Sequence, residues 1–198
     1  APDELRVALE SLTNFKLIQA CAALDTNGDI ADPAVAMRQV LSSLARRWLE
    51  LHEEIKVHSR NLKKLTATAA PELVAAFGIG PDIAAEMLVT AGDNNDRIRS
   101  DAALAKLCGA CPIPTGSGKT NGRHRLNRGG NRQANAALYR AIIVRMRWHP
   151  PTIAYVERRT AEGLSKKEII RCLKRYLARE IYRLLPEPSS APALASAA

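Results

Sequence analysis

The residue types best suited to chemistry lie together in one segment, Gly116 to Asn135, with the sequence GSGKTNGRHRLNRGGNRQAN. The segment combines glycines, one serine and several arginines. Arginine and lysine side chains bind phosphate groups, and glycines let a backbone approach a ligand closely. These residue types therefore indicate work on phosphates. By residue type alone, however, Ser117 between Gly116 and Gly118 reads as an ordinary turn residue.

The overlapping stretch PTGSGKT (Pro114 to Thr120) looks like the phosphate-binding loop of P-loop NTPases. In such a loop backbone N–H groups hold the phosphates, Lys119 would contact the outer phosphates and Thr120 would bind Mg²⁺. The context differs in three respects. Ile113 stands where the first glycine belongs, no apolar helical run begins at Asn121, and no acid follows to hold the metal ion. The sequence therefore disfavours an ATPase.

Charge is distributed very unevenly along the chain. Between Ala102 and Val156, 55 consecutive residues include no Asp or Glu. This acid-free segment contains Lys106, Lys119, Arg123, Arg125, Arg128, Arg132, Arg140, Arg145 and Arg147, and it accounts for the whole formal charge of +9. Such an excess indicates a surface for a polyanion, most commonly a nucleic-acid backbone. The alternative, a solvated basic face, fits less well because ordinary soluble surfaces mix both signs.

Composition narrows the class of protein. Of 198 residues 46% are apolar but only 4% are aromatic, which favours packed helices over a β-sandwich. No apolar run reaches the roughly 18 residues of a membrane span, so we expect no membrane association. Four cysteines indicate a reducing compartment. Cys108 and Cys111 have the spacing of half a zinc site, but nothing completes it, and we expect small packed side chains there.

The first half of the chain predicts two helices joined by a turn. Residues 3 to 24 fit an amphipathic helix, and Asp32-Pro33 fits the start of a second helix that runs to about Leu65. The second helix carries a seam of positions separated alternately by three and four residues, as in a coiled coil. The seam consists of Leu41, Leu44, Trp48, Leu51, Ile55, His58, Leu62 and Leu65. It needs a partner, and we expect a homodimer or higher oligomer rather than packing within the chain.

A helical hairpin is expected between Pro71 and Asp93. A short helix leads to Gly78-Ile79-Gly80, and Pro81 begins the next helix. Glycines permit the tight turn, and the free N–H groups at the helix start can hold a DNA phosphate without reading a base. The pattern resembles the helix-hairpin-helix motif of nonspecific DNA binders, with Gly78 and Gly80 as DNA-binding candidates. A simple αα-hairpin is the alternative.

The rest of the chain predicts further helices around a basic loop or short hairpin at residues 108–127. The expected helices lie at about 100–107, 130–148, 150–162 and 166–185. Ser165 and Glu168 fit a capping box. On the last helix we expect Tyr176 to point inward and Lys174 outward. On the helix at 130–148, one side is traced by Ala134, Ala137, Leu138, Ala141, Ile142 and Arg145.

Several of these parts, taken in order, resemble a known family over roughly Pro2 to Leu185. After the seam helix come GIGPDIAAEMLVTAGD, LAKLCGACPIPTGSGKTNGRHRLNRGGNRQANAAL and RTAEGLSKKEIIRCLKRYLAREIY. This order is similar to the C-terminal part of the insertion-sequence transposases with a DEDD-type, RuvC-like N-terminal domain, the bridge-RNA-guided serine recombinases. The expected fold is mainly α, with a long coiled-coil helix leading into a compact helical domain that holds the helix-hairpin-helix-like motif and the Gly/Arg-rich loop.

The resemblance also implies an organisation of the chain. Residues 1–32 would link to a preceding nuclease domain, 33–70 would form the coiled-coil helix, 71–185 the DNA-binding transposase domain, and 186–198 a disordered tail. No cofactor is expected in this chain, because the family's acidic tetrad, which binds Mg²⁺, would lie in the preceding domain. The chain alone would then bind nucleic acid without cutting it. The implied setting is the cytoplasm of a bacterial-type cell, associated with the nucleoid.

What the resemblance implies for chemistry is DNA transposition through a serine nucleophile. The matching residue is Ser117, which would form a phosphoserine link to DNA. The candidates for phosphate contact are Lys119, Arg123, Arg125, Arg128 and Arg132. DNA and a guide RNA are the implied partners. Two alternatives stay open, a noncatalytic basic nucleic-acid-binding protein and, less well supported, a fragment of a P-loop ATPase.

Overall fold

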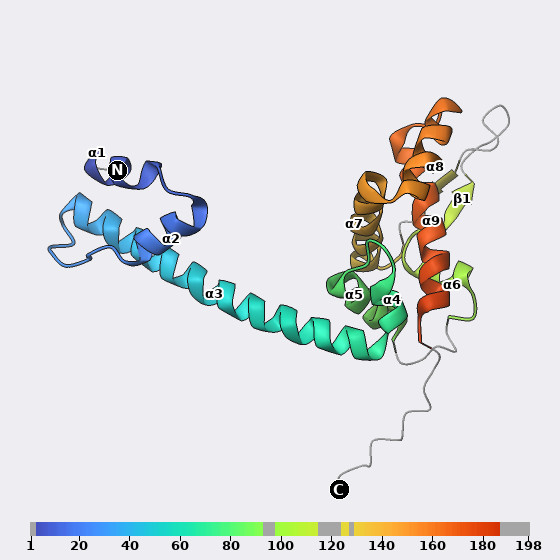
Figure 1. The fold of residues 1–198 in the computed structure, drawn as a ribbon, viewed down its shortest axis with the longest axis horizontal. Helices are drawn as coiled ribbons and strands as arrows, with labels where there is room; N and C mark the ends of the chain where they lie inside the picture. Colours follow the sequence, from blue (N-terminus) through green and yellow to red (C-terminus); the bar gives the residue numbers. More distant parts are fainter. Residues whose placement is uncertain (1–2, 93–97, 115–123, 127–128, 187–198) are drawn as a thin grey trace, which may run out of the picture. The chain divides into compact units, whose positions relative to one another are not determined.

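A computed structural model describes residues 3–92, 98–114, 124–126 and 129–186 (Figure 1). The expectation of a mainly α fold is confirmed: apart from two strands of three residues each, the regular elements among these residues are helices. The chain divides into two compact units, Ala1–Asn61 and Leu62–Ala198, and each is treated by itself below. The tail expected to be disordered falls almost entirely in residues 187–198, outside the described part of the chain.

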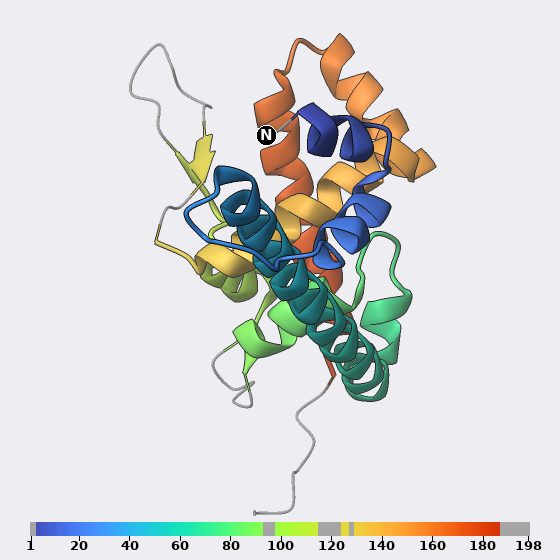
Figure 2. The ribbon, with the colours of Figure 1, turned by 90° about the vertical axis from the view of Figure 1, so that its left-hand side faces the viewer.

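The first unit holds α1 (Asp3–Glu10), α2 (Asn14–Ala22) and most of α3 (Pro33–Ala69), shown in blue and teal in Figure 2. The prediction of one helix over residues 3–24 is wrong, because the helix is interrupted between Glu10 and Asn14. Thr13 has extended backbone angles (φ −67°, ψ 153°) and precedes α2. Short polar side chains such as those of Ser11 and Thr13 can hydrogen-bond to nearby backbone groups and so disfavour a helix interior. Helical spacing of the apolar residues is therefore not enough to predict a continuous helix here.

The start of α3 follows the prediction. Asp32 Oδ1 accepts a hydrogen bond of 2.9 Å from the Ala34 N–H, and Pro33 occupies the first helical position. α2 packs against the N-terminal half of α3, where the Phe15 ring meets the Trp48 ring edge-on at 6.0 Å between centroids. The helix continues to Ala69, about one turn beyond the expected end.

In the residues that the structure describes, the second unit has six further helices and its own hydrophobic core. They are α4 (Pro71–Ala75), α5 (Pro81–Ala91), α6 (Asp101–Leu107), α7 (Arg132–Trp148), α8 (Pro150–Ala161) and α9 (Lys166–Leu184). The six residues predicted to share one side of α7 are all buried. α7 packs between α5 and α9, with α8 against both α7 and α9 (Figure 1). Alanines on α7 let these neighbours approach closely.

Side-chain caps define the ends of several of these helices. Ser100 caps α6, Asn131 caps α7, and Ser165 with Glu168 forms the expected capping box at α9. Gly163 ends the segment after α8 with φ of +87°, a conformation that favours glycine. Among the described helices none is long and apolar enough to cross a membrane.

Two side-chain orientations on α9 differ from the prediction. Lys174 is buried, with 7% of its surface exposed, whereas Tyr176 is 52% exposed. The buried ammonium group of Lys174 donates a hydrogen bond to Asn135 Oδ1 at 2.6 Å and lies 5.3 Å from the centre of the Tyr139 ring. A lysine can point inward where α7 supplies such partners. The charge of Lys174 alone therefore predicted the wrong orientation for its side chain.

Candidate nucleic-acid interface

Two short antiparallel strands flank the Gly/Arg-rich loop. The sequence predicted either a loop or a short hairpin here, and the paired strands correspond to the hairpin. β1 (Pro112–Pro114) pairs antiparallel with β2 (His124–Leu126), so that Ile113 lies opposite Arg125 and Pro114 opposite His124. The nine residues that join these strands include three of the predicted site residues. Ser117, Lys119 and Arg123, together with Arg128 beyond β2, lie outside the residues that the structure describes.

The two chain segments at the base of the hairpin are packed unusually closely. A Cβ atom added at Gly130 would lie 2.1 Å from the Gly109 nitrogen and 2.4 Å from its Cα atom. The N–H of Asn131 donates to the Leu107 carbonyl at 2.6 Å, and Gly109 itself has φ of +64°. Glycine at position 130 is therefore required by backbone contact. This contact holds the entry and the return of the hairpin together.

A side-chain network supports the same junction. The amide nitrogen of Asn135 donates to the carbonyl oxygens of Cys108 and Gly109, at 2.9 and 3.0 Å. The oxygen of that amide accepts the hydrogen bond from Lys174, whose pKa is lowered by burial. Arg171 on α9 donates to the His124 carbonyl of β2 at 3.2 Å. α7 and α9 thus both anchor the base of the hairpin.

The predicted turn between α4 and α5 is present, and its two glycines serve different purposes. Gly78 has φ of +76°, and a Cβ atom there would lie 3.2 Å from both the Ala141 carbonyl and the Arg145 side chain. Position 78 is thus glycine for conformation and packing. Gly80 precedes α5, no atom lies within 4 Å of its Cβ position, and no side chain caps the helix. The start of α5 is open to a phosphate. The DNA-binding role of both glycines stays a prediction.

Arg145, one of the cations of the acid-free segment, is committed to the fold. Its Nε donates to the Phe77 carbonyl at 2.7 Å, and its two terminal nitrogens donate to the Glu180 carboxylate at 2.6 and 2.7 Å. The hydrogen bonds from Arg145 lower the pKa of Glu180. Arg145 therefore joins the turn after α4 to α7 and α9, and it is withheld from phosphate.

Other cations of the segment remain at the surface. Lys106 on α6 and Arg132, Arg140 and Arg147 on α7 are all exposed. Arg125 belongs to β2. On α9, by contrast, Arg175 and Arg179 both pair with Asp101, whose pKa is lowered chiefly by the hydrogen bond from Arg179. The exposed positive charge of the second unit thus includes α6 and α7.

The cysteines do not form a metal site in the described parts of the chain. Cys108 is buried against the core, and burial raises the pKa of its thiol to about 12. A thiol of that kind stays protonated at neutral pH and is a poor zinc ligand. Among the described residues, no three His, Cys, Asp or Glu side chains come together as ligands.

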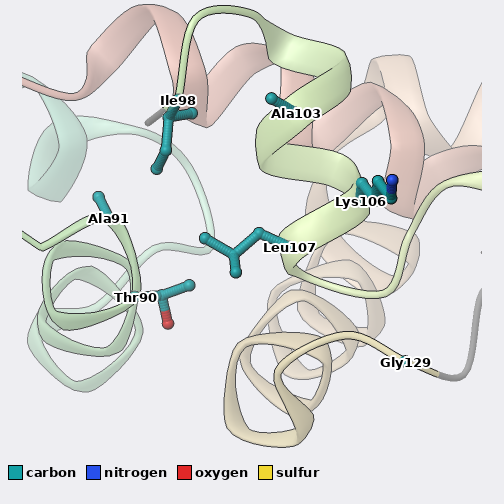
Figure 3. Close-up of a pocket in the computed structure, with 7 residues that line it drawn as sticks. All are labelled: Thr90, Ala91, Ile98, Ala103, Lys106, Leu107 and Gly129. Carbon is teal, nitrogen blue, oxygen red and sulfur yellow. The ribbon is translucent and has the colours of Figure 1, made fainter. Parts of the chain in front are cut away.

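A cavity of about 420 Å³ lies between α5 and α6, beside the start of α7 (Figure 3). Thr90 and Ala91 from α5 and Leu107 from α6 line it, and Gly129 closes one side. The Thr90 hydroxyl accepts a hydrogen bond of 3.4 Å from the Asn131 side chain. The lining is largely apolar, so the cavity offers few polar groups to hold a ligand in one orientation.

The local fold also bears on the ATPase alternative. A P-loop passes directly into a helix, whose N-terminus faces the phosphates. Here the first described residues after the motif are His124–Leu126, and they form a strand paired with β1. The secondary structure around PTGSGKT therefore differs from that of a P-loop.

One part of the chain is similar to a family of transposases. Residues 70–157 match the model of the Transposase IS116/IS110/IS902 family. This match begins at α4, includes the hairpin and ends within α8. It therefore contains the whole acid-free segment, including the position of Ser117.

Similar proteins carry insertion-element names. The chain is 27% identical over 165 residues to the insertion element IS110 uncharacterized 43.6 kDa protein of Streptomyces coelicolor, covering 82% of this chain and 40% of that protein. It is 26% identical to the IS116 44.8 kDa protein of Streptomyces clavuligerus, covering 69% and 35%, respectively. A 27% identity to the IS900 42 kDa protein of Mycobacterium paratuberculosis covers 54% and 27%. The matches span two fifths or less of these relatives, and they support a transposase-related role.

Proposed function

We propose that this chain is the DNA-binding, serine-bearing part of an insertion-element transposase. The observation that carries the proposal is a coincidence of position. The transposase match at residues 70–157 covers β1, β2 and the position of Ser117 between them. These strands and Ser117 lie within the acid-free segment, and so does all of the preceding helix α6 except its first residue. Similarity and charge thus point to the same stretch of chain.

The proposed chemistry is a transesterification at phosphorus. The Ser117 hydroxyl oxygen attacks a DNA phosphodiester, a new serine O–P bond forms, and the bond from phosphorus to one sugar oxygen breaks. The proton released by the serine hydroxyl is balanced by the proton that the departing sugar oxygen takes up, so that it leaves as a hydroxyl. Lys119 and Arg123, two and six residues beyond the serine, would stabilise the charge that develops on the phosphoryl oxygens. In a second transesterification a sugar hydroxyl of another strand attacks the phosphorus, its O–P bond forms, and the serine oxygen leaves and regains a proton.

Mg²⁺ is not assigned to this chain. The residues that the structure describes bring no set of three acidic, histidine or cysteine ligands together, and the proposal routes no step through a metal ion here. An acidic-tetrad domain would supply metal-dependent activation of the serine, as the resemblance implies. Guide RNA as the selector of the target and association with the nucleoid belong to the same proposal.

Support for a positioned loop comes from the base of the hairpin. The Gly109–Gly130 contact and the Asn135 amide tie its two ends to each other, and Arg171 ties β2 to α9. A catalytic loop benefits from such anchoring because misplacement of a nucleophile by about 1 Å can reduce the rate about a hundredfold.

The DNA-binding half of the proposal predicts a steep dependence of affinity on salt. Lys119, Arg123, Arg125, Arg128 and Arg132 are the proposed phosphate contacts. Each contact contributes about −0.9 to the slope of log K against log salt for duplex DNA. We expect Arg132→Gln to reduce the slope by about one such unit, measured by fluorescence anisotropy of a labelled duplex.

Arg183→Gln is the matched control, because Arg183 is an exposed arginine at the far end of α9. It should leave the slope unchanged. An affinity for duplex that does not vary between low and high salt would refute phosphate binding. A noncatalytic binding protein, the alternative function, would show the same salt dependence but no role for Ser117.

The seam of α3 supports a proposed homodimer. Leu44, Ile55 and Leu65 on this seam are 63%, 61% and 66% exposed, although each is a large apolar residue. A second copy of the helix would cover such a stripe in a coiled coil. We expect the chain to sediment as a dimer at tens of micromolar, and Ile55→Glu to convert it to a monomer of 21.5 kDa.

Val57→Glu provides the control for that experiment. Val57 lies on the same helix and is 44% exposed, but it is not a seam position. A monomeric wild-type chain, or equal dissociation by both substitutions, would rule out dimerisation through the seam.

A further inference from the structure

The side of α7 opposite the core is an unusual mixture of aromatic, apolar and cationic residues. Tyr139, Ile143, Val144 and Trp148 are 45%, 38%, 42% and 62% exposed. Arg140 and Arg147 are exposed between them. Together these six residues are called the α7 outer face. Neither core packing nor the proposed serine chemistry explains the large exposed rings.

The Trp148 end of this face adjoins the turn between α4 and α5. A Cβ atom at Gly78 would lie 3.7 Å from a methyl group of Val144, so the turn backbone lies against α7. Phe77, 44% exposed, stacks on His149 with 5.0 Å between ring centroids, and His149 directly follows Trp148. The open start of α5 and the exposed aromatic rings therefore occur in the same region of the second unit.

Cations accompany both aromatic rings of the outer face. The Arg147 guanidinium lies 4.9 Å from the centre of the Trp148 ring, and the Lys174 ammonium lies 5.3 Å from that of Tyr139. α7 carries four arginines and no acid, and of these arginines only Arg145 is buried. An exposed apolar stripe rimmed by positive charge is complementary to a ligand that combines flat apolar groups with negative charge.

Unpaired nucleotides have this combination of groups. Their bases present ring faces for stacking and their phosphates present negative charge, whereas in a duplex the ring faces are covered by neighbouring bases. We propose that the α7 outer face binds an unpaired stretch of a DNA strand, with bases stacked on Trp148 and Tyr139 and phosphates at Arg140 and Arg147. This inference rests on the proposed DNA-binding function and adds the state of the DNA that this face takes.

DNA rather than RNA follows from the residues of the face and from the proposed reaction. Between Tyr139 and Trp148 the sequence has no Asn, Gln, Ser or Thr that could select RNA through the 2′-hydroxyl. Strand exchange must separate DNA strands near the scissile phosphates. A surface that binds unpaired bases would therefore hold the separated strand on α7, the helix that follows the hairpin.

The test uses the full 198-residue chain in a Trp48→Phe background, so that Trp148 is the only tryptophan. Addition of a thymidine oligonucleotide of about ten nucleotides should quench Trp148 fluorescence to saturation, because a stacked base quenches the indole. By anisotropy of the labelled oligonucleotide, Trp148→Leu, made in the wild-type chain, should weaken binding roughly 5- to 100-fold. Affinity for a duplex should change less than about twofold, since duplex bases cannot stack on the ring.

Two further variants keep the test independent of one substitution. Arg147→Gln should weaken oligonucleotide binding and lower its salt slope, because it removes a phosphate contact. Val89→Ala is the control, since Val89 is 78% exposed on α5 outside the outer face. It should leave binding unchanged. Thermal unfolding of each variant separates lost contacts from lost folding.

The possible outcomes separate this inference from the proposed function. Duplex binding without quenching by the thymidine oligonucleotide would overturn the inference and leave the proposed function intact. Failure to bind either DNA would overturn both. Quenching by a uridine oligonucleotide alone would replace DNA by RNA. A blue shift of Trp148 emission on raising the protein concentration without DNA would assign the face to a second copy of the chain.

Discussion

Replacing Ser117 with alanine should abolish strand exchange while leaving DNA affinity unchanged within about twofold. The hydroxyl is the proposed nucleophile, and loss of a covalent nucleophile typically lowers a rate by about 10³-fold or more. The substitution removes one oxygen atom and no charge, so the phosphate contacts remain. Recombination between donor and target plasmids measures the effect, with the acidic-tetrad domain, Mg²⁺ and a guide RNA supplied.

Two neighbouring hydroxyls provide controls for this result. Thr115 and Thr120 lie within three residues of Ser117 in the same loop, and each can be replaced with alanine. Both variants should retain most recombination if the serine is the nucleophile. Equal activity of Ser117→Ala and wild type would exclude the serine mechanism and favour a noncatalytic binding protein.

Gly130→Ala should cause the largest loss of stability among single methyl additions in the second unit. The added carbon would meet backbone atoms of Gly109 at 2.1 and 2.4 Å, and backbone cannot rotate aside as a flexible side chain can. We expect a cost of about 3 kcal/mol in the free energy of unfolding, at the upper end of ordinary overpacking. Urea unfolding followed by Trp148 fluorescence in the Trp48→Phe background measures it.

Gly80→Ala is the matched control, because no atom lies within 4 Å of its Cβ position. Its cost should stay near 1 kcal/mol or below, reflecting the poorer helix start of alanine. Similar costs for the two substitutions would contradict the close packing at the base of the hairpin. In the complete recombination system Gly130→Ala should also reduce activity, because the loop with Ser117 would be displaced.

Local rules predicted much of the second unit correctly. The shared side of α7, the capping box at Ser165 and the turn at Gly78 all follow from periodicity or from short-range chemistry. These features depend on residues within a few positions of each other, where the sequence determines geometry directly. The break at Thr13 was missed because apolar spacing outweighed the polar turn residues around it.

Long-range pairing was not predictable in the same way. Arg145 and Glu180 are 35 residues apart, and Lys174 and Asn135 are 39 apart. Each pair depends on how α7 and α9 pack, which no local pattern specifies. The acid-free segment likewise lacks acids along the sequence, yet the fold brings Glu180 to one of its arginines. The charge pattern therefore indicated where the basic residues lie in the sequence. It did not indicate that one of them, Arg145, forms an ion pair with Glu180.

For the candidate site, residue chemistry and resemblance contributed different information. Charge predicted a polyanion-binding segment, and glycine spacing predicted the turn before α5. Nothing in the residue types around Ser117 distinguishes a nucleophile from a turn serine. The family match covers this position, but covalent chemistry at it has to be measured directly.

Mapping a covalent DNA adduct is the most direct measurement. The chain would be incubated with the acidic-tetrad domain, Mg²⁺, guide RNA and end-labelled DNA, denatured in SDS and digested. Mass spectrometry of the nucleotide-linked peptide would then identify the attached residue. We predict a phosphoester on Ser117 that is lost in Ser117→Ala. An adduct on another residue, or strand exchange with no protein–DNA adduct, would contradict the proposed mechanism.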